Sequence, residues 1–378
     1  MKYIKRELEK VIKDHLFKGK VIIVYGPRQA GKTTLMKEVV RDFGQTVRFI
    51  DCELLANNEM LMRRNMDEIF SLVEGYKIVV FDEAQTVKGI GSVLKSLFDH
   101  RPEIQYIATG SSSFELANEV SEPLTGRSRE YILYPLGLTE LVDRSFDAEN
   151  RLPDLMRFGG YPGIQGQTEE EKKIQLNTLV SQYLYKNVLS LEGFRKPELV
   201  VSLLKLLAFQ IGSEVSFREL SSTLGASIAT VQKYISLLEK NYVIVRIGAY
   251  SENKRNEVVK TKKIFFVDLG LRNALVDNFS PMQVTERPDV GSLFENVMIV
   301  ERLKHLAHSG RLAPKQYFWR TIGGKEIDYI EKVNGKLAAF EFKWSNQESK
   351  PPKSFLKDYK DASFATVTKK EAYDFLVQ

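Results

Sequence analysis

The feature that most constrains this 378-residue chain is the segment Gly26–Thr33, which reads Gly-Pro-Arg-Gln-Ala-Gly-Lys-Thr. It fits the pattern G-x-x-x-x-G-K-[ST] and lies between an apolar run, Val21–Tyr25, and a helix-like stretch, Thr33–Asp42. Glycines let backbone N–H groups curl around phosphate oxygens, and the following helix directs its positive end at them. The pattern predicts a nucleotide-phosphate site, and the alternative is an ordinary turn that matches by chance.

Each residue type in this loop has an expected role towards ATP and Mg²⁺. Lys32 would neutralise the β- and γ-phosphates, and Thr33 would bind the metal ion. The residues expected to contact the nucleotide are Gly26, Pro27, Arg28, Gln29, Ala30, Gly31, Lys32, Thr33 and Thr34.

Three further apolar runs follow the loop, at Val47–Asp51, Ile78–Asp82 and Ile104–Thr109, and helix-like stretches such as Ile90–Asp99 separate them. This alternation is typical of a parallel sheet with helices on both faces. The expected fold class of residues 1–135 is therefore α/β.

The run Ile78–Asp82 ends in an acid and is followed by a second one, Glu83. An aspartate at the carboxyl end of such a strand can hold Mg²⁺, and the glutamate can orient and polarise a water. We therefore expect Asp82 at the metal ion and Glu83 in hydrolysis. The chain has no Asn-Lys-x-Asp motif for reading guanine, which favours ATP over GTP. The alternative is a solvated strand end.

Two weaker elements follow the last strand. Gly110–Ser113 could place a hydroxyl between the γ-phosphate and the attacking water, or be a plain serine-rich turn. Leu124–Arg129 offers two arginines, Arg127 and Arg129, and one of them could act as an arginine finger, in its own chain or on a neighbouring subunit of a homo-oligomer. Arg127 is the candidate followed below.

Composition indicates the cellular compartment of the chain. The single cysteine, Cys52, predicts a reducing compartment. The charged start lacks the apolar run of a signal peptide, and no stretch reaches the length of a membrane helix. We expect a cytoplasmic protein without membrane contact. The net charge of +6 permits a nucleic-acid partner but does not require one.

Residues 201–280 have the pattern of a helix-turn-helix with a wing. Ser216–Glu219 is a capping box, Ser227–Lys240 has one apolar face, and alternating residues from Val243 begin a hairpin. The side chains expected to face DNA are Thr230, Gln232, Lys233 and Ser236 on the second helix and Lys254, Arg255, Lys260, Lys262 and Lys263 in the wing. The alternative is a domain that packs against protein.

Asn334–Gly335 predicts a two-residue hairpin turn in which Val333 pairs with Lys336. In that register Asp328 lies opposite Glu341, and Lys343 shares their face. Opposed like charges destabilise a sheet, so a divalent cation between the two carboxylates would explain them. The alternative is a pair of solvated acids.

The pattern D…E-x-K formed by Asp328, Glu341 and Lys343 resembles that of restriction-endonuclease-like nucleases. The resemblance implies that the acids hold Mg²⁺ and that the lysine stabilises or activates a hydrolytic water. It also implies a further metal-binding acid on an earlier helix, a place that Glu295 matches. A non-catalytic relic of the fold remains the alternative.

Residues 1–200 resemble a family of prokaryotic AAA-type ATPases whose members carry a C-terminal domain of unknown function, and the match continues to the end of the chain. The motifs that carry it are Gly26–Thr34, Phe81–Gln85, Thr109–Ser112, Leu124–Arg127 and Gly159–Pro162. The resemblance implies four domains: an AAA core at 1–135, a helical lid at 136–200, a winged helix at 201–280 and a restriction-endonuclease-like domain at 281–378.

The leading hypothesis is an ATP-hydrolysing protein that acts on DNA and, in its strongest form, an ATP-controlled nuclease. The rival is an ATP-dependent switch or scaffold whose winged helix and C-terminal domain bind a partner without cutting DNA. A non-enzymatic DNA-binding regulator is third, and Lys32, Asp82 and Glu83 speak against it.

Overall fold

The computed structural model describes residues 3–111, 122–181, 196–251, 262–283, 287–310, 313–321 and 323–378. The chain forms two compact units. Unit 1 contains residues 1–135 with 240–242 and 307–311, and unit 2 contains residues 136–239, 243–306 and 312–378. The finer division into four domains stays a prediction.

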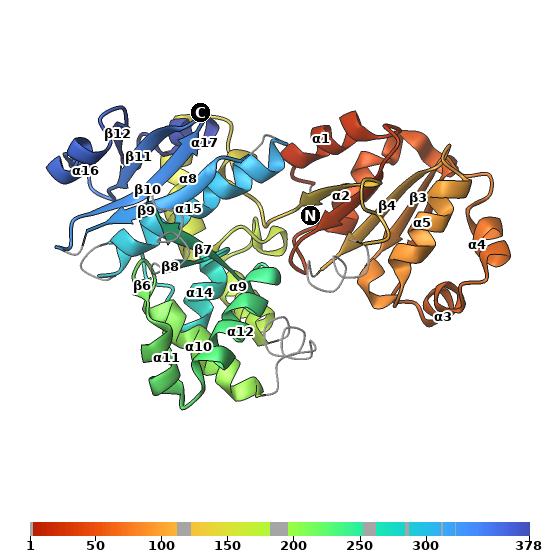
Figure 1. Cartoon of the computed structure of the whole chain (residues 1–378), viewed down its shortest axis with the longest axis horizontal. Coiled ribbons are helices and arrows are strands. Elements are labelled where there is room, and N and C mark those ends of the chain that lie inside the picture. Colours follow the sequence, from red (N-terminus) through yellow and green to blue (C-terminus); the bar gives the residue numbers. More distant parts are fainter. Residues whose placement is uncertain are drawn as a thin grey trace. The chain divides into compact units, whose positions relative to one another are not determined.

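A five-stranded parallel sheet forms the centre of unit 1, with the strand order β2-β3-β4-β1-β5 (Figure 1). The expected α/β fold class is confirmed. The elements are α1 (Glu7–His15), β1 (Val21–Tyr25), α2 (Lys32–Val39), η1 (Arg41–Thr46), β2 (Val47–Asp51), α3 (Leu55–Arg63), α4 (Met66–Val73), β3 (Ile78–Asp82), η2 (Ala84–Thr86), α5 (Ile90–His100), β4 (Gln105–Gly110) and β5 (Ser128–Ile132).

Both faces of this sheet are covered at its centre, which explains why strands β1 and β3 are continuous apolar runs. On one face, residues of α1 and α2 such as Leu8 and Leu35 form a core with Ile22 and Ile107. Ile23, which points to the other face, is also fully buried. In the three central strands, β1, β3 and β4, residues with polar side chains lie towards the ends of the strands.

The register of the sheet brings three strand ends to one edge. Tyr25 of β1 pairs with Gly110 of β4, and Phe81 of β3 pairs with Ala108 of β4. The loop after β1, the acids that end β3 and the hydroxyl of Thr109 therefore share the carboxyl edge, where ligands of open α/β sheets bind.

Unit 2 is built on a seven-stranded mixed sheet of order β12-β11-β10-β9-β7-β8-β6. β7 pairs in parallel with β9, so strands of the hairpin predicted near Val243 and strands of the C-terminal region form one sheet. The strands are β6 (Glu214–Val215), β7 (Ile244–Ala249), β8 (Lys262–Phe266), β9 (Lys315–Arg320), β10 (Glu326–Val333), β11 (Lys336–Phe342) and β12 (Ser363–Val367).

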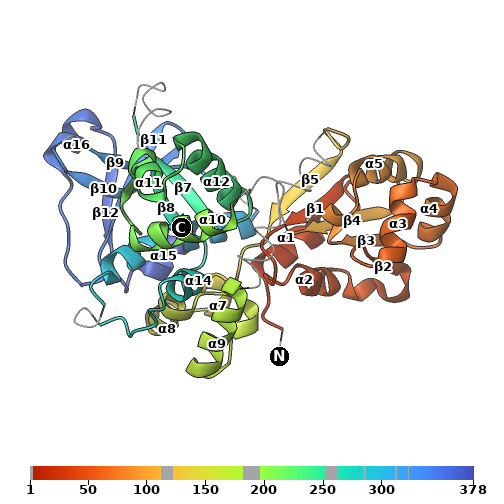
Figure 2. The ribbon, with the colours of Figure 1, turned by 90° about the horizontal axis from the view of Figure 1, so that it is seen from below.

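Helices surround this sheet, and α10, α11 and α12 group beside β7 and β8 (Figure 2). The predicted apolar face of α12 is confirmed, since Val231, Tyr234, Ile235 and Leu238 are buried. The predicted wing tip is Ser251–Asn256, and all of it except Ser251 lies outside the described residues. The helices are α7 (Leu138–Leu141), α8 (Ser145–Phe158), η3 (Pro162–Ile164), α9 (Glu169–Leu179), α10 (Pro197–Phe209), α11 (Phe217–Leu224), α12 (Ile228–Lys240), α14 (Leu269–Leu275), α15 (Val290–His308), α16 (Lys353–Asp358) and α17 (Ala372–Val377).

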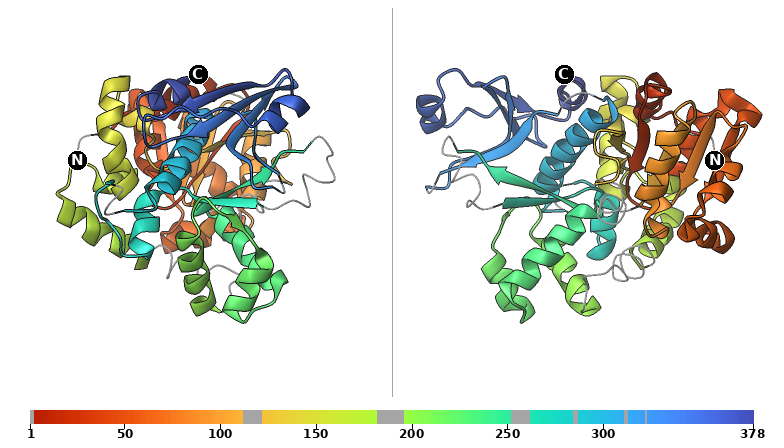
Figure 3. Two further views of the ribbon diagram at one scale, coloured as in Figure 1. Left: turned by 90° about the vertical axis from the view of Figure 1, so that its left-hand side faces the viewer. Right: turned by 45° about the vertical axis from the view of Figure 1, so that its right-hand side comes forward.

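The long helix α15 packs its apolar residues against this sheet (Figure 3). Leu293 and Phe294 of α15 share a core with Phe318 and Tyr329 of the strands. Among the described residues, no helix combines the length and apolar character needed to cross a membrane.

The hairpin of β10 and β11 has the predicted register, since Val333 pairs with Lys336 and Tyr329 with Phe340. Asn334 and Gly335 have φ angles of 50° and 83°. Positive φ at both positions is the signature of the two-residue turn that Asn-Gly favours. The pairing ends at Tyr329 and Phe340, and one further step of the same register would place Asp328 opposite Glu341.

The Gly159–Gly160 pair is a point of close backbone approach within unit 2. The buried carboxylate of Asp268 accepts hydrogen bonds from Gly160 N at 2.7 Å and from Leu271 N, in the first turn of α14, at 3.1 Å. A Cβ atom at Gly160 would lie 2.0 Å from the carbonyl oxygen of Leu136. The motif is therefore explained by packing.

We expect Gly160→Ala to lower the free energy of unfolding by about 1–3 kcal/mol, because the added methyl meets a backbone carbonyl that cannot move easily. Gly291→Ala is the matched control, since a Cβ atom there meets nothing within 4 Å. On helix α15 it should leave stability unchanged or raise it by up to about 1 kcal/mol. Urea unfolding of both variants measures the difference, and equal stabilities would contradict this account of the motif.

Candidate functional site

The loop after β1 has the backbone geometry of an anion site. Gln29 and Gly31 have φ angles of 63° and 95°, and such left-handed residues turn neighbouring N–H groups towards one concave point. Gly31 is also the N-cap of α2, which no side chain caps, so the positive end of the helix faces the same region. A Cβ atom at Gly26 would lie 2.1 Å from the carbonyl oxygen of Leu133, so the turn out of β1 requires glycine.

Lys32 is only 4% exposed and points back over this loop. Its ammonium donates hydrogen bonds to the carbonyl oxygens of Gly26 at 3.0 Å and Pro27 at 3.3 Å, and Glu83 Oε1 lies 3.5 Å away. Burial lowers the pKa of Lys32, while Glu83 and then Asp82 act in the opposite direction. On balance the pKa of Lys32 is lowered, and nucleotide phosphates beside it would favour its charged form.

Asp82 is held by two hydroxyl groups. Thr33 Oγ1 donates to Asp82 Oδ2 at 2.7 Å, and Thr109 Oγ1 donates to Asp82 Oδ1. A hydroxyl and a carboxylate in contact are the pair that holds Mg²⁺ in P-loop hydrolases. The structure thus brings together both residues predicted to bind this ion.

Glu83 stands in a strained and fixed position. Its φ is 50° and its N–H donates to Thr109 Oγ1 at 3.1 Å. Gln85 Nε2 donates to Glu83 Oε2 at 2.7 Å and lies 3.0 Å from Ser111 Oγ. Burial would raise the pKa of Glu83, but the charge of Lys32 and the Gln85 hydrogen bond outweigh it and keep the pKa below its usual value. The carboxylate stays ionised and can accept a hydrogen bond from water.

Sequence reasoning gave no role to Thr109 or Gln85, although both lie in motifs quoted for the family resemblance. It placed the candidate hydroxyl in Gly110–Ser113, and of these serines Ser111 contacts Gln85, whereas Ser112 and Ser113 lie outside the described residues. The position of Gln85, two residues after Glu83 at the end of a strand, is the one feature of the sequence that could have indicated a role at the site.

Arg127 is not brought to this site within its own chain. Ser128 pairs with Val21, so Arg127 lies beside the start of β1, whereas the loop follows Tyr25 at the end of β1. Four residue steps along a strand separate the two ends by about 13 Å. The guanidinium forms an ion pair with Asp99 at 2.9 Å. Arg127 therefore does not reach the nucleotide loop of its own chain. A role as an arginine finger across a subunit interface stays a prediction.

The groups around the loop fit Mg-ATP. The backbone N–H groups and Lys32 match the phosphates, Thr33 and Asp82 match the metal ion, and Glu83 lies beside both. Gln85 Oε1 is a buried oxygen without a hydrogen-bond partner in the described part of the chain, so it can accept from a bound water. ATP and Mg²⁺ at this site remain the prediction made from the motif.

A second group of acids lies in unit 2. Carboxylate oxygens of Glu295, Glu326 and Asp328 lie within 4.8 Å of one another, on α15 and β10. Sequence reasoning expected Glu295 and Asp328 but not Glu326, although Glu326 is two residues before Asp328 and so shares its face of the strand. The structure therefore adds one acid to the predicted set.

Glu341 and Lys343 adjoin this group from β11. Lys343 Nζ lies 2.8 Å from Glu341 Oε1, and Phe342 N donates to Asp328 Oδ2 at 2.8 Å. Burial and then the charge of Glu341 raise the pKa of Asp328 to about 6. Burial raises the pKa of Glu295 to about 8. The carboxylates repel one another, as the hairpin register predicted, although Glu341 is not one of the three acids that lie closest together.

The expectation that Lys263 faces DNA is wrong. Its side chain is 2% exposed, and its ammonium forms ion pairs with Glu295 at 2.7 Å and with Glu326. Burial acts to lower the pKa of Lys263, but the two acids outweigh it and hold the pKa above its usual range. Gln232 and Lys233 of α12 are exposed as expected, and Lys254, Arg255 and Lys260 lie outside the described residues.

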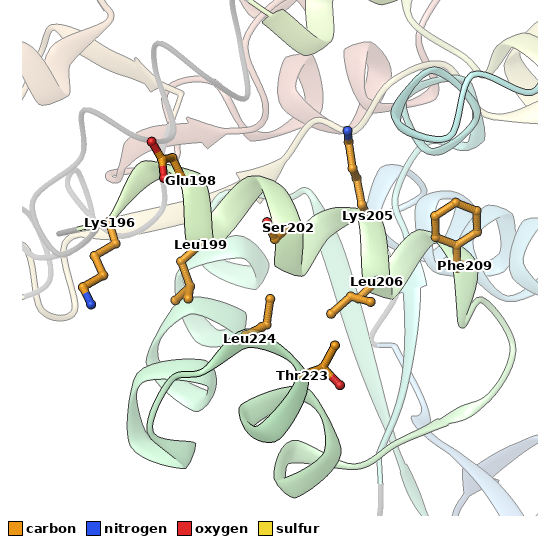
Figure 4. Close-up of a pocket in the computed structure, with 9 residues that line it drawn as sticks. All are labelled: Lys196, Glu198, Leu199, Ser202, Lys205, Leu206, Phe209, Thr223 and Leu224. Carbon is orange, nitrogen blue, oxygen red and sulfur yellow. The ribbon is translucent and has the colours of Figure 1, made fainter.

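An open, mainly apolar groove lies between α10 and α11 (Figure 4). Leu199, Leu206 and Leu224 line it, and Phe209, 70% exposed, stands at one end. No sequence motif predicted this groove, because its apolar residues read as the ordinary core positions of two helices.

Comparison with family models assigns the chain in three consecutive pieces. A model described as an AAA domain matches residues 18–142. Two models described as domains of unknown function, DUF8612 and DUF4143, match residues 149–282 and 290–376.

Relatives cover most of the chain. An uncharacterized protein of Mycobacterium tuberculosis is 27% identical over 338 residues, which are 88% of this chain and 72% of that protein. An uncharacterized protein of Haemophilus influenzae is 23% identical over 334 residues, 82% of this chain and 81% of that protein.

Two solved structures illustrate the likeness of fold. The RuvB Holliday junction branch migration motor of Thermotoga maritima has a TM-score of 0.33 at 18% identity, over 68% of this chain and 95% of that chain. The Pif1 helicase from Candida albicans has a TM-score of 0.27 at 16% identity, over 70% and 64%. At these scores the likeness carries no information on function. From its family matches and its sheet, the chain has an AAA-type P-loop ATPase domain followed by two domains of unknown function.

Proposed function

We propose that this chain hydrolyses ATP at the carboxyl edge of the unit 1 sheet and acts on DNA through unit 2, where its acid cluster binds a divalent ion. The observation that carries the proposal is the meeting of Lys32, Thr33, Asp82 and Glu83 around one loop. Mg-ATP supplies the phosphoanhydride bond and the metal ion, and this chain supplies the groups that hold them.

Lys32 and Glu83 form an ion pair at 3.5 Å. Phosphate oxygens would draw the ammonium away from Glu83, which would free one carboxylate oxygen while Gln85 still holds the other. That free oxygen can orient a water towards the γ-phosphate and accept its proton. ATP binding and preparation of the base are thereby linked through one lysine.

Lys32→Ala should lose nucleotide affinity, because the phosphates lose their buried cation, whereas Glu83→Gln should keep affinity and slow turnover by about 10²-fold or more. Lys37→Ala, an exposed lysine on the same helix, is the matched control and should change neither. Fluorescent-nucleotide binding and phosphate release measure the two effects. Wild-type turnover in Glu83→Gln would show that this carboxylate does not position the water.

The proposal that unit 2 binds DNA is supported by the order of its elements. Helix α10, strand β6, helices α11 and α12 and the hairpin β7–β8 follow one another as in a winged helix, and α12 exposes Gln232 and Lys233. Exposed amide and ammonium groups on such a helix suit base edges and phosphates.

DNA affinity should fall steeply with salt, and replacing Lys233, Lys254 and Arg255 together by Ala should weaken binding and flatten the slope. Lys205→Ala, an exposed lysine on α10, should leave the slope unchanged. Fluorescence anisotropy on a duplex at several salt concentrations gives both quantities. Salt-independent binding, or a triple variant that binds as the parent does, would favour the rival proposal of a switch that binds a protein partner.

The acid cluster supports a divalent ion because opposed carboxylates repel until a cation lies between them. In a Lys32→Ala background, where the nucleotide-linked metal is lost, Mg²⁺ or Mn²⁺ should still raise the melting temperature. Asp328→Ala or Glu341→Ala should abolish that rise. If the site cuts DNA, Lys343→Ala should stop cleavage and spare ATP hydrolysis. Metal binding without cleavage would leave a binding role, and no divalent effect would reject the site.

A further inference from the structure

One cation is already present inside the acid cluster of unit 2. Lys263 lies on β8, between β6 and β7 in the sheet, and its ammonium contacts Glu295 at 2.7 Å and also Glu326. At 2% exposure the ammonium has no access to bulk water, and its charge is balanced by these acids. Lys263 Nζ also lies 5.5 Å from the ring centroid of Phe318, on β9, which is the strand beyond β7 in the sheet.

The formal charges around the cluster limit how many metal ions it can take. Arg320 bridges Glu214 at 3.7 Å and Glu326 at 3.6 Å, and Lys343 pairs with Glu341. With every group counted in its charged form, the four acids in these ion pairs and the adjoining Asp328 face three bases within the described residues, which leaves a formal charge of −2. One divalent ion would neutralise this set, and two would make it positive. The acids are Glu214, Glu295, Glu326, Asp328 and Glu341, and the bases are Lys263, Arg320 and Lys343.

We propose that Lys263 is a resident cation that fills one metal position of the cluster, so that the site binds a single divalent ion on the side of Asp328 and Glu341. The inference rests on the metal site proposed above and adds its stoichiometry and its fixed cation. Glu295 and Glu326 are paired with the buried lysine. Asp328, the third acid of the group, has no ion pair among the described contacts. Glu341 pairs with Lys343, whose side chain is 38% exposed and can turn to solvent when a metal ion binds.

A consequence is that the site is shared by two segments of the chain. Lys263 belongs to the segment matched at 149–282, and its partners Glu295 and Glu326 belong to the segment matched at 290–376. Because β8 pairs with both β6 and β7, the lysine is fixed by backbone pairing on both sides. The C-terminal segment therefore receives part of its site from the hairpin of the preceding one.

Counting bound Mn²⁺ by calorimetry tests the proposal in full-length Lys32→Ala protein without nucleotide. The parent should bind one ion. Lys263→Met in the same background should bind two, because the position left by the ammonium regains the carboxylates of Glu295 and Glu326, and the formal charge of the set becomes −3, which one divalent ion does not neutralise. It should also melt lower than the parent in EDTA and gain more from Mn²⁺. Lys262→Met, the neighbouring residue on β8, is the control and should keep one ion.

A second variant covers the case in which Lys263→Met does not fold without metal. Lys263→Met/Glu326→Gln removes the ammonium together with one partner, so it should fold in EDTA and bind one ion. Two ions in this double variant would overturn the assignment of Glu326 to the lysine-filled position.

The outcomes separate the two proposals. One ion with parental affinity in both the parent and Lys263→Met would overturn the resident-cation inference and leave the metal site standing. No ion in either protein would reject the metal site itself. No ion in the parent but one in Lys263→Met would show that the lysine excludes metal altogether, which overturns the predicted stoichiometry.

Discussion

A buried ammonium group stays charged only where carboxylates replace the water that it has lost, and both candidate sites depend on this constraint. Lys32 in unit 1 and Lys263 in unit 2 are 4% and 2% exposed, and each lies against acids of its own unit. In each pair, a ligand that binds one partner leaves the charge of the other partner unbalanced.

The two lysines differ in what can replace their partners. Lys32 stands at an open edge of a parallel sheet, where backbone N–H groups of a loop and a helix end await an anion, so phosphate can take the place of Glu83. Lys263 is surrounded by acids on an interior strand, so only another cation can relieve Glu295 and Glu326. One site is therefore built to exchange an anion, and the other holds a cation permanently.

The sequence predicts those features of this structure that depend on residues close together in the chain. Strands β1, β2 and β3 begin and end where their apolar runs do, and the hairpin register follows from Asn334 and Gly335, because turn geometry and periodicity are local. The contacts of Lys263 could not be foreseen, since burial of a lysine depends on the pairing of β7 with β9, which joins distant parts of the chain. The place of Glu326 in the acid cluster could have been predicted, because it is two residues before Asp328 and so lies on the same face of the strand.

We infer two cation sites of different kinds in this chain, one that needs nucleotide and one that does not. Counting Mn²⁺ bound to the wild-type protein, with and without a non-hydrolysable ATP analogue, tests it most directly. The account predicts one ion per chain without nucleotide, held near Asp328 and Glu341, and two when the analogue brings a second ion to Thr33 and Asp82. An equal count in both conditions, or no ion without nucleotide, would contradict it.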